Sequence, residues 1–320
     1  MNFPFQLISD AEFDVIGFGT NAVDYLIRVP EYPAFDSKIE LMSYVQAAGG
    51  EVASTMVGLQ RLGFRTTYVG RFGDDHEGEI GLRSLADEGV DVTNTEVVRS
   101  AKTQVAFILI DAGNGERTVI WHRDRRLGYS DVDAPVRVAG RGKILHLTPH
   151  DTRACILLAR AARENGVIVS IDLDNTFDDL DTLLPLVDIC TMSAAFPEKL
   201  LGIADRRTAM REIVSRFGCA VVGITQGSAG SIYLSQDVFV ETPAFDVPGG
   251  CVDTTGAGDA FRAGFLCGVL NNESVENSAR IANAVAALKC RGVGARTALP
   301  SRDELVGLLT VTGVELADEG

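Results

Sequence analysis

Short apolar runs alternate with longer amphipathic stretches along most of the chain. Segments with apolar residues near a 3.6-residue period indicate helices, as in residues 53–62, 152–164 and 207–217. The apolar runs are short enough to be buried strands, and they comprise residues 15–18, 105–110, 144–147, 167–171 and 220–224. Because strands that alternate with helices form parallel sheets covered on both faces, we expect an α/β fold. It should have a mainly parallel sheet sandwiched by helices, in a Rossmann-like three-layer arrangement.

Two regions break this alternation, because neither contains a helical pattern. Residues 24–47 and 101–124 both consist of extended segments and turn signals. The second includes FILIDAGNGERTVIW, which is typical of a β-hairpin with Asn114 and Gly115 at its turn. We interpret the two regions as a small β-sheet that forms a discontinuous lid beside the α/β body. Residues 1–312 are then predicted to be a single domain, followed by a short tail at residues 313–320.

The composition narrows the class of protein. Of the 320 residues, 46% are hydrophobic, which is enough for a sizeable core. A formal net charge of −15 argues against a nucleic-acid or anionic-membrane partner, since both attract basic surfaces. The start, MNFPFQLISDAEF, shows no basic segment before a long apolar run, so no signal peptide or spanning helix is expected. Six cysteines without CxxC spacing favour reduced thiols and a cytoplasmic location over disulfides or zinc.

The candidate chemistry begins with the sequence VDTTGAGDAF at residues 252–261. Its Gly256-Ala257-Gly258 run can direct consecutive backbone N–H groups into one concavity, and residues 259–270 look helical. Backbone N–H groups at a helix N-terminus favour an anion, especially a phosphate. A carboxylate such as Asp259 would compete with the phosphate for this site. Its presence makes sense if it takes the proton from a hydroxyl group that attacks the phosphate. The alternative is an ordinary Gly-rich helix cap without chemistry.

The longer string DTTGAGDAFRAGFL resembles the C-terminal signature of the ribokinase-like, or PfkB-family, carbohydrate kinases. AGGEVAS at residues 48–54 and VGRFGDDHEG at residues 69–78 are similar to the first signature of that family. The resemblance extends over nearly the whole chain, and it implies a ribokinase-like fold and phosphoryl transfer from ATP with Mg²⁺. TQGSAG and AVAALKCRGVGARTALP most resemble the branch that contains ketohexokinase and sulfofructose kinase.

The resemblance also implies roles for individual residues. Asp259 matches the catalytic base, and Gly256, Ala257 and Gly258 match the anion hole for the transferred phosphoryl group. The positions that match sugar contacts are Asp24, Gly49, Gly50, Ser54 and Thr148. The positions that match the nucleotide site are Thr225, Gly227, Ser228, Gly230 and Asn283. A monovalent cation such as K⁺ would be held, mostly by backbone carbonyls, at Asp253, Thr255, Lys289, Gly292, Gly294 and Ala298.

Two departures from the family pattern bear on the substrate and the metal. Ser54 stands where an asparagine is usual, so a shorter hydroxyl replaces one sugar-binding amide. Ser193 and Phe196 stand where many relatives have an Asn-x-x-Glu pattern, so we expect phosphates and water to hold most of the Mg²⁺. Thr148 carries no charge, so recognition of a sulfonate or phosphate needs a cation elsewhere in the sugar pocket. The candidates are Arg123, Arg125, Arg126 and Arg153.

These observations predict an ATP-dependent kinase that acts on a hydroxymethyl group of a sugar. The expected sugar is a ketohexose or a derivative such as fructose or sulfofructose. Two alternatives stay open. A nucleoside kinase would need a slot for the base, for which Phe18, Tyr25 and Trp121 are candidates. A catalytically silent sugar-sensing protein would have no need of Asp259 beside an anion hole.

The last expectation concerns assembly. Alternation along the predicted hairpin puts Phe107, Leu109 and Ile120 on one apolar face, which we interpret as the inner face of the lid. That face would need cover while the lid is open, and a twofold copy of the chain would supply it. We therefore expect a homodimer through the lid, with a small-molecule sugar and ATP as the ligands.

Overall fold

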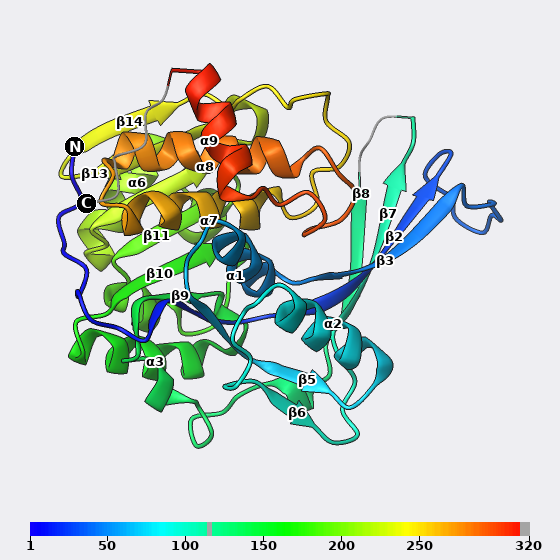
Figure 1. The fold of residues 1–320 in the computed structure, drawn as a ribbon, viewed down its shortest axis with the longest axis horizontal. Coiled ribbons are helices and arrows are strands. Elements are labelled where there is room, and N and C mark those ends of the chain that lie inside the picture. The colour runs from blue at the N-terminus through cyan, green and yellow to red at the C-terminus, as the bar shows by residue number, and fades with distance from the viewer. Residues whose placement is uncertain (114–116, 314–320) are drawn as a thin grey trace.

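Eight strands form the large sheet of the protein within residues 1–113 and 117–313, which are the residues that the computed structural model describes (Figure 1). Their order is β14-β13-β12-β11-β10-β9-β1-β4. All neighbours from β4 to β12 are parallel, whereas β13 and β14 are antiparallel to their neighbours. This arrangement confirms the mainly parallel α/β fold expected from the sequence. The strands are β1 (Phe13–Phe18), β4 (Thr66–Val69), β9 (Gly142–Leu147), β10 (Ile168–Leu173), β11 (Ile189–Ser193), β12 (Val221–Thr225), β13 (Ser231–Ser235) and β14 (Val238–Thr242).

Helices cover both faces of the large sheet, so the body has three layers (Figure 1). One layer consists of α3 (Thr152–Glu164), α4 (Leu180–Leu183), α5 (Phe196–Leu201) and α6 (Arg206–Phe217). The opposite layer consists of α1 (Glu51–Arg61), α7 (Ala257–Leu270), α8 (Val275–Lys289) and α9 (Arg302–Val311). The remaining helix, α2, packs on a short sheet of two strands, and these elements are α2 (His76–Asp87), β5 (Arg71–Gly73) and β6 (Glu96–Val98). Single 3₁₀ turns lie at Arg125–Leu127, Val136–Val138, Pro149–Asp151, Leu184–Leu186 and Gly227–Ala229.

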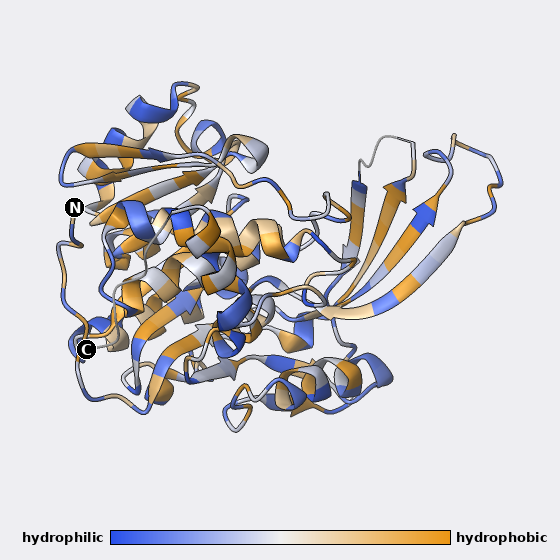
Figure 2. Cartoon of the chain, turned by 45° about the horizontal axis from the view of Figure 1, so that its top comes forward, coloured by the Kyte–Doolittle hydropathy of each residue, from blue (hydrophilic) through white to orange (hydrophobic). Residues whose placement is uncertain are grey.

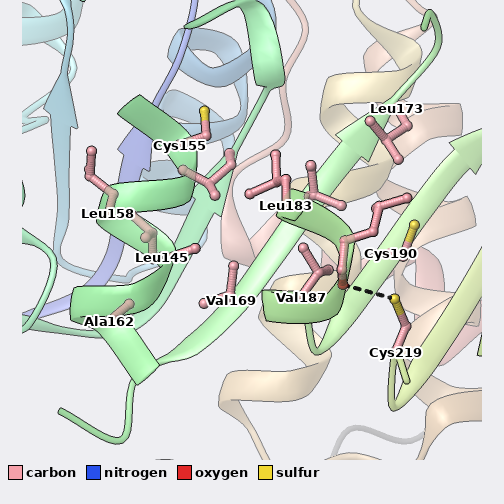
Figure 3. Close-up of a cluster of buried hydrophobic side chains, with 14 of the residues drawn as sticks. Leu145, Cys155, Leu158, Ala162, Val169, Leu173, Leu183, Val187, Cys190 and Cys219 are labelled. Carbon is pink, nitrogen blue, oxygen red and sulfur yellow. Dashed lines mark hydrogen bonds between the residues drawn. The ribbon is translucent and has the colours of Figure 1, made fainter. Parts of the chain in front are cut away.

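Alternation along each buried strand divides the core into two halves, one on each side of the large sheet. Leu145 of β9 and Val169 of β10 belong to one half, and their neighbours Ile144 and Ile168 belong to the other. Figure 3 shows the first half, where Leu158 of α3 reaches the same cluster. Full burial of one such side chain contributes about 1.5–3 kcal/mol. The continuous apolar runs of the sequence therefore reflect strands that are covered on both faces.

The extended segments of the sequence form a second, small sheet that projects from the body (Figure 1). Among the described residues its strand order is β3-β2-β7-β8, with β2 and β7 parallel and the other neighbours antiparallel. Figure 2 shows hydrophobic residues along this projecting sheet as well as in the enclosed large sheet. The predicted turn at Asn114 and Gly115 lies outside the described residues. The strands are β2 (Ala22–Val29), β3 (Ser43–Gly49), β7 (Val105–Asp111) and β8 (Arg117–His122).

The strand register decides which face of the small sheet is the inner one. Asp24 pairs with Ala106, and Ala106 pairs with Trp121, so these three side chains share one face. The same face holds a small buried cluster that includes Leu26, Ala106 and Ile108. Asp24 is buried with them, so this face is turned toward the body.

The prediction for the inner face of the lid was wrong. Phe107 pairs with Ile120, and Leu109 lies two residues further along the same strand. These side chains are one residue out of step with Ala106, which places them on the opposite side of the sheet from Asp24. Phe107 and Ile120 are 42% and 55% exposed, so they belong to an outer apolar face.

Three further findings bear on the sequence-based expectations. Within the described part of the chain, no helix combines the length and the apolar composition that crossing a bilayer requires. All six cysteines are free, and Cys251 is exposed. The assignment of residues 1–312 to a single domain stays a prediction.

Candidate active site

The sequence at residues 252–261 ends in the first turn of α7. Gly256 precedes the helix with a φ of 76°, and the first helical hydrogen bond runs from Ala260 N to Gly256 O at 2.9 Å. The N–H groups of Gly258 and Asp259 come before that bond, so they have no carbonyl partner within the helix. A Cβ on Gly256 would lie 2.7 Å from Ala295 Cα, so only glycine fits there. The geometry is that of an anion-binding position.

Asp259 lies in the same turn as these amides, with its side chain partly buried. Burial raises the pKa of Asp259 well above its ordinary value, and the charges of Glu51 and Asp172 raise it further. A carboxylate with a raised pKa accepts protons closer to neutral pH, which suits a general base. Ala257 has a different role, because its N–H already donates to Thr254 O at 3.1 Å and shapes the turn.

Two carboxyl groups that the sequence analysis missed lie near Asp259. Glu51 begins α1, and burial, together with the charges of Asp174 and Asp172, raises its pKa to about 8. Asp172, near the end of β10, forms an ion pair with Arg262, which lies one turn beyond Asp259 on α7. Both acids had a signal in the sequence, since Glu51 follows the glycine pair of the first signature and Asp172 follows an apolar run.

Magnesium has no preformed cage in the part of the chain that the structure describes. Among residues 1–113 and 117–313, no three His, Cys, Asp or Glu side chains are grouped to hold a metal ion. Phe196 begins α5 and is fully buried, and Ser193 ends β11. Ligation of a magnesium ion mostly by phosphates and water stays a prediction.

The predicted sugar contacts Asp24, Gly49 and Gly50 meet where β2 and β3 join the body. Asp24 is 6% exposed, and burial raises its pKa to about 6 against the opposing charge of Arg296. A Cβ on Gly49 would lie 2.1 Å from Asp24 Oδ2, so only glycine fits beside this carboxyl group. Gly50 precedes α1 with a φ of 89°, and a Cβ there would lie 2.3 Å from Asn21 Cα. The structure thus brings the glycine pair and Asp24 together.

A buried guanidinium that the sequence analysis missed lies against these residues. Arg296 is 6% exposed, and its Nε donates to Ser54 Oγ at 3.2 Å. Its Nη1 donates to Ser84 Oγ at 3.1 Å, and its Nη2 donates to Gly49 O. Burial lowers the pKa of Arg296 to about 10, so the group stays charged at neutral pH. The guanidinium thus places N–H donors beside Ser54, where the family usually has an asparagine amide.

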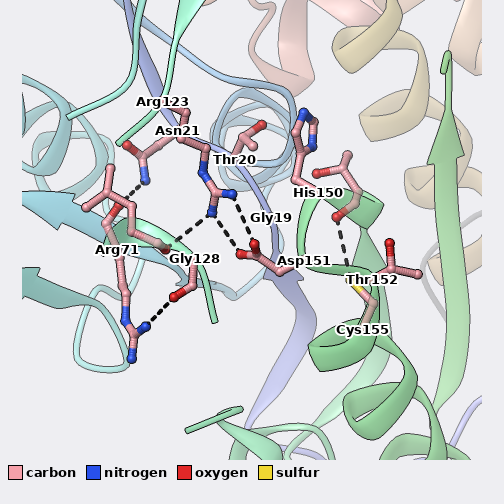
Figure 4. A network of polar contacts seen from close by, with 12 residues as sticks. Gly19, Thr20, Asn21, Arg71, Arg123, Gly128, His150, Asp151, Thr152 and Cys155 are labelled. Carbon is pink, nitrogen blue, oxygen red and sulfur yellow. Dashed lines mark hydrogen bonds and ion pairs between the residues drawn. The ribbon is translucent and has the colours of Figure 1, made fainter. Parts of the chain in front are cut away.

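The arginines considered for an anionic substrate are engaged elsewhere or exposed. Arg123 pairs with Asp151 at 2.8 Å, and Figure 4 shows this pair near Thr20 and His150. An arginine that is already paired has less charge to offer a ligand. Of the other three, Arg126 pairs with Asp124, Arg153 pairs with Asp179, and Arg125 is exposed.

Thr148 follows β9, close to a group of aromatic rings. It is 2% exposed, and among the described residues its Oγ1 has no hydrogen-bond partner. Trp121, on the inner face of the small sheet, stands edge-on to His150 with ring centroids 6.4 Å apart. His150 in turn contacts Phe177 at 5.1 Å, and both line a pocket of about 880 Å³. Three rings therefore gather where the small sheet meets the body.

The predicted nucleotide loop, residues 225–230, follows β12. Gly227 and Gly230 have φ values of 58° and 93°, and a Cβ on Gly230 would lie 2.0 Å from Thr242 O. Thr225 Oγ1 donates to Met192 O at 3.3 Å, and Ser228 is exposed. A pocket of about 720 Å³ adjoins the loop, and its walls include Gln226, Ala229, Ser231 and Thr242.

Asn283 lies behind the wall of this pocket. It is 5% exposed, and its amide donates to Thr242 Oγ1 at 2.9 Å and to Ser231 Oγ at 3.3 Å. The same amide also donates to Ala279 O at 2.9 Å. The donors of Asn283 are therefore engaged within the protein, where they position two hydroxyl groups that line the pocket.

Asp253 joins the two loops that were predicted to hold a monovalent cation. Its Oδ1 accepts both the N–H and the hydroxyl of Thr255 at 2.8 Å, and its Oδ2 accepts the N–H of Gly294 at 2.8 Å. Burial alone would raise the pKa of Asp253, but these hydrogen bonds keep it below its ordinary value.

The other three residues of this set lie in or beside the same loops. Lys289 ends α8, and its Nζ donates to Asp253 O at 2.8 Å. Gly292 and Ala298 come together after it, since a Cβ on Gly292 would lie 2.9 Å from Ala298 Cβ. The structure therefore gathers all six residues, with a lysine ammonium already on one of the carbonyl oxygens.

The sequence and the fold have relatives among known proteins. Residues 14–302 match the model of a protein family that is described as pfkB family carbohydrate kinase. An ATP-dependent ribose-1-phosphate kinase from Halopiger xanaduensis is 31% identical over 290 residues, which cover 90% of this chain and 95% of that protein. A nucleoside kinase from Methanothermobacter thermautotrophicus is 27% identical, with 93% and 96% covered. The structure of Arabidopsis thaliana ribokinase complexed with ribose and ATP is similar with a TM-score of 0.82 and 24% identity, with 93% and 98% covered. A ribokinase and fructokinases are among the further relatives.

Proposed function

This chain belongs to the pfkB family of carbohydrate kinases, and from that premise we propose that it transfers a phosphoryl group from ATP to a hydroxymethyl group of a sugar. The observation that carries the proposal is the first turn of α7. It combines free backbone amides with Asp259, a carboxyl group whose pKa is raised by burial. Asp24, the predicted sugar contact, is near enough for its charge to raise that pKa further. Base, anion hole and sugar contact thus meet in one place.

In this mechanism Asp259 takes the proton of the sugar hydroxyl while the hydroxyl oxygen attacks the γ-phosphorus in line. The N–H groups of Gly258 and Asp259 donate to the oxygens of the transferring group. Mg²⁺ would neutralise part of the phosphate charge. Thr55 Oγ1 donates to Asp259 O at 3.3 Å and so ties α7 to α1, which begins beside the glycine pair. This contact keeps the base in register with the sugar side of the site.

The small sheet acts as the lid in this proposal. Its inner face carries Asp24, and Arg117 of β8 donates to Thr254 Oγ1 in the loop that leads to the anion hole. A lid that spans these two points encloses the sugar between the sheet and α7. Closure excludes water, which would otherwise compete with the sugar for the phosphoryl group.

The substrate class follows from the polar groups beside Asp24. A ketohexose such as fructose remains a candidate, and ribose and ribose 1-phosphate join it because relatives are named as kinases for them. Arg296 favours a substrate that carries a phosphate or sulfonate, because its buried positive charge lies next to the predicted sugar contacts. The relatives do not single out the ketohexokinase branch.

A nucleoside kinase is the second candidate, and the aromatic rings near Thr148 favour it. Trp121 is 57% exposed on the inner face of the small sheet, so its ring is free to stack on a base. The other two rings considered for that slot are unsuitable. Phe18 is 1% exposed within the core, and Tyr25 stacks on Phe107 on the outer face.

ATP consumption measured against fructose, sulfofructose, ribose, ribose 1-phosphate and adenosine tests the function and separates the candidates. We expect one compound to exceed the others by about tenfold or more in kcat/KM, since a site that binds polar groups discriminates strongly. Trp121→Ala should lower kcat/KM for adenosine but not for a sugar phosphate. Nucleotide binding without turnover of any compound would instead favour the catalytically silent sensor.

We also propose a homodimer through the outer face of the small sheet. Tyr44, Phe107 and Ile120 are 65%, 42% and 55% exposed on that face. Apolar side chains gathered in this way mark an interaction surface, and a twofold copy presents the same surface in return. A cytoplasmic location stays a prediction, which the free thiols support.

A further inference from the structure

Lys289, the last residue of α8, buries its whole side chain beside the loop that forms the anion hole. It is 0% exposed, and its Nζ donates to the backbone oxygen of Asp253 at 2.8 Å. An ammonium group that leaves water is costly unless it meets carbonyl or carboxylate oxygens. The buried position of Lys289 therefore indicates that its charge stabilises nearby groups by more than this cost.

The ammonium lies where the loop before α7 meets the loop after α8. Asp253 links the two loops, because its carboxylate accepts the N–H groups of Thr255 and Gly294, each at 2.8 Å. Neutral N–H groups thus bind the carboxylate of Asp253, whereas the ammonium of Lys289 binds the backbone oxygen of Asp253. Gly256, at the end of the first loop, packs directly against Ala295 of the second. A charge that holds these loops together also holds the amides of the anion hole.

A K⁺ ion does not fit the same position. The residues predicted to hold it include Asp253 as a carbonyl donor, and the oxygen of that carbonyl already accepts Lys289 Nζ. A second cation on this oxygen would lie against the ammonium. Two positive charges at one buried oxygen repel strongly, since little water is present to screen them.

We propose that the ammonium of Lys289 is a built-in monovalent cation that stabilises the anion-hole loops and makes the enzyme independent of K⁺. Lys289 is a positioning residue, since it acts on the first turn of α7 through Asp253 and touches neither sugar nor nucleotide in this scheme. The proposal concerns the loops beside the anion hole and does not depend on which sugar is phosphorylated.

The first test compares the wild-type protein in potassium chloride and in choline chloride at equal ionic strength. Thermal unfolding reports on the loops without any substrate, and turnover uses the most active compound of the panel above. We expect the same unfolding midpoint in both salts and kcat values that agree within about twofold. A several-fold higher kcat in potassium, or a midpoint raised by potassium, would overturn the proposal.

The second test removes the ammonium. Lys289→Ala leaves space for an ion. Arg280→Ala is the matched control, because Arg280 is a half-exposed cation on the same helix and pairs with Glu276. In choline, Lys289→Ala should lose about 10–100-fold in kcat, the usual scale for groups that orient a site from behind. Potassium should restore most of the lost kcat and raise the unfolding midpoint of this variant. The control should have the same kcat and midpoint in both salts.

Indifference of Lys289→Ala to potassium, in both kcat and unfolding midpoint, would contradict a role as a cation substitute. Should this variant fail to fold in either salt, the salt comparison of the wild-type protein decides alone. Loss of turnover with every compound of the panel would count against the proposed function, whereas the unfolding midpoints would still test Lys289.

Discussion

The large sheet and the small sheet both contain apolar strands, yet these strands are covered very differently. In β12, every residue from Val221 to Ile224 is buried, whereas every residue of β8 is exposed. Helices cover the large sheet on both sides. On one side α7 packs between α1 and α8, so the first turn of α7 is held firmly. The edge strands of the small sheet, β3 and β8, are mostly exposed, and elements with few buried contacts move at low cost in free energy. The proposed base and anion hole therefore belong to the well-covered region, and the proposed lid to the less covered one.

Asp24 stands at the boundary between these two regions. It belongs to β2 of the small sheet, yet it is 6% exposed, and Gly49 at the end of β3 lies against its carboxyl group. Changes in the well-covered region should therefore alter kcat, changes at Asp24 should alter sugar binding, and changes on the outer face of the small sheet should alter assembly.

The largest effect is expected in the well-covered region. Asp259→Asn should fold and bind ATP normally but lose about 10²–10⁴-fold in kcat, the usual contribution of a general base. Steady-state kinetics and nucleotide binding measured on the same preparation check this. Asp87→Asn, an exposed acid on α2, is the control. Turnover of Asp259→Asn within a few-fold of the wild-type value would contradict the assigned role.

A smaller effect is expected at the boundary. Asp24→Ala should raise the KM for the sugar by about 10–100-fold, because a buried ligand hydroxyl that loses its acceptor costs about 1–3 kcal/mol. The KM for ATP should stay unchanged, since Asp24 lies on the sugar side of the site. If only the KM for ATP moved, the sugar would have been placed at the wrong end of the site.

The pH dependence of sugar binding also tests the role of Asp24. The pKa of Asp24 is raised from 3.8 to about 6, so the folded protein holds this proton at a pH where the unfolded chain has lost it. Its contribution to folding stability is therefore greatest below pH 3.8 and is lost as the pH rises through about 6. Sugar binding needs the ionised form, so the sugar KM should rise about tenfold between pH 7 and pH 5.

Asp24→Asn is the control for that measurement, because an amide does not titrate. Its sugar KM should be higher than that of the wild-type protein and nearly constant from pH 5 to pH 7. A wild-type KM that does not change over this range would show that Asp24 is ionised throughout, or that it does not contact the sugar.

The smallest effect on activity is expected at the outer face of the small sheet. Ile120→Glu should convert a dimer into a monomer, because a charge cannot be buried in an apolar interface without a partner. Folding stability should change by no more than about 0.5 kcal/mol, since Ile120 is exposed in the single chain. Light scattering measures the mass, with Val238→Glu on β14 as the control. A wild-type protein that is monomeric at micromolar concentration would exclude the dimer.

Local sequence determined most of the secondary structure and the core of the candidate site. The helix expected at residues 152–164 is α3 with the same bounds, because its apolar period alone selects the buried face. The candidate anion-hole residues could also be read locally, since Gly256, Gly258 and Asp259 are neighbours in one turn, whereas the contact of Gly256 with Ala295 could not. Predictions of secondary structure succeeded where the controlling interactions lie within a few residues.

The tertiary structure decided which face is covered and which distant charges meet. A two-residue period divides Phe107 and Ala106 between two faces of a strand, but only packing against the body shows which of them is the inner one. Arg296 reaches Ser54 across 242 positions, and Lys289 reaches Asp253 across 36. No local pattern encodes such contacts, because they depend on how α1, α7 and α8 pack against one another. Folding therefore places the buried cations beside the predicted sugar contacts and the predicted anion hole.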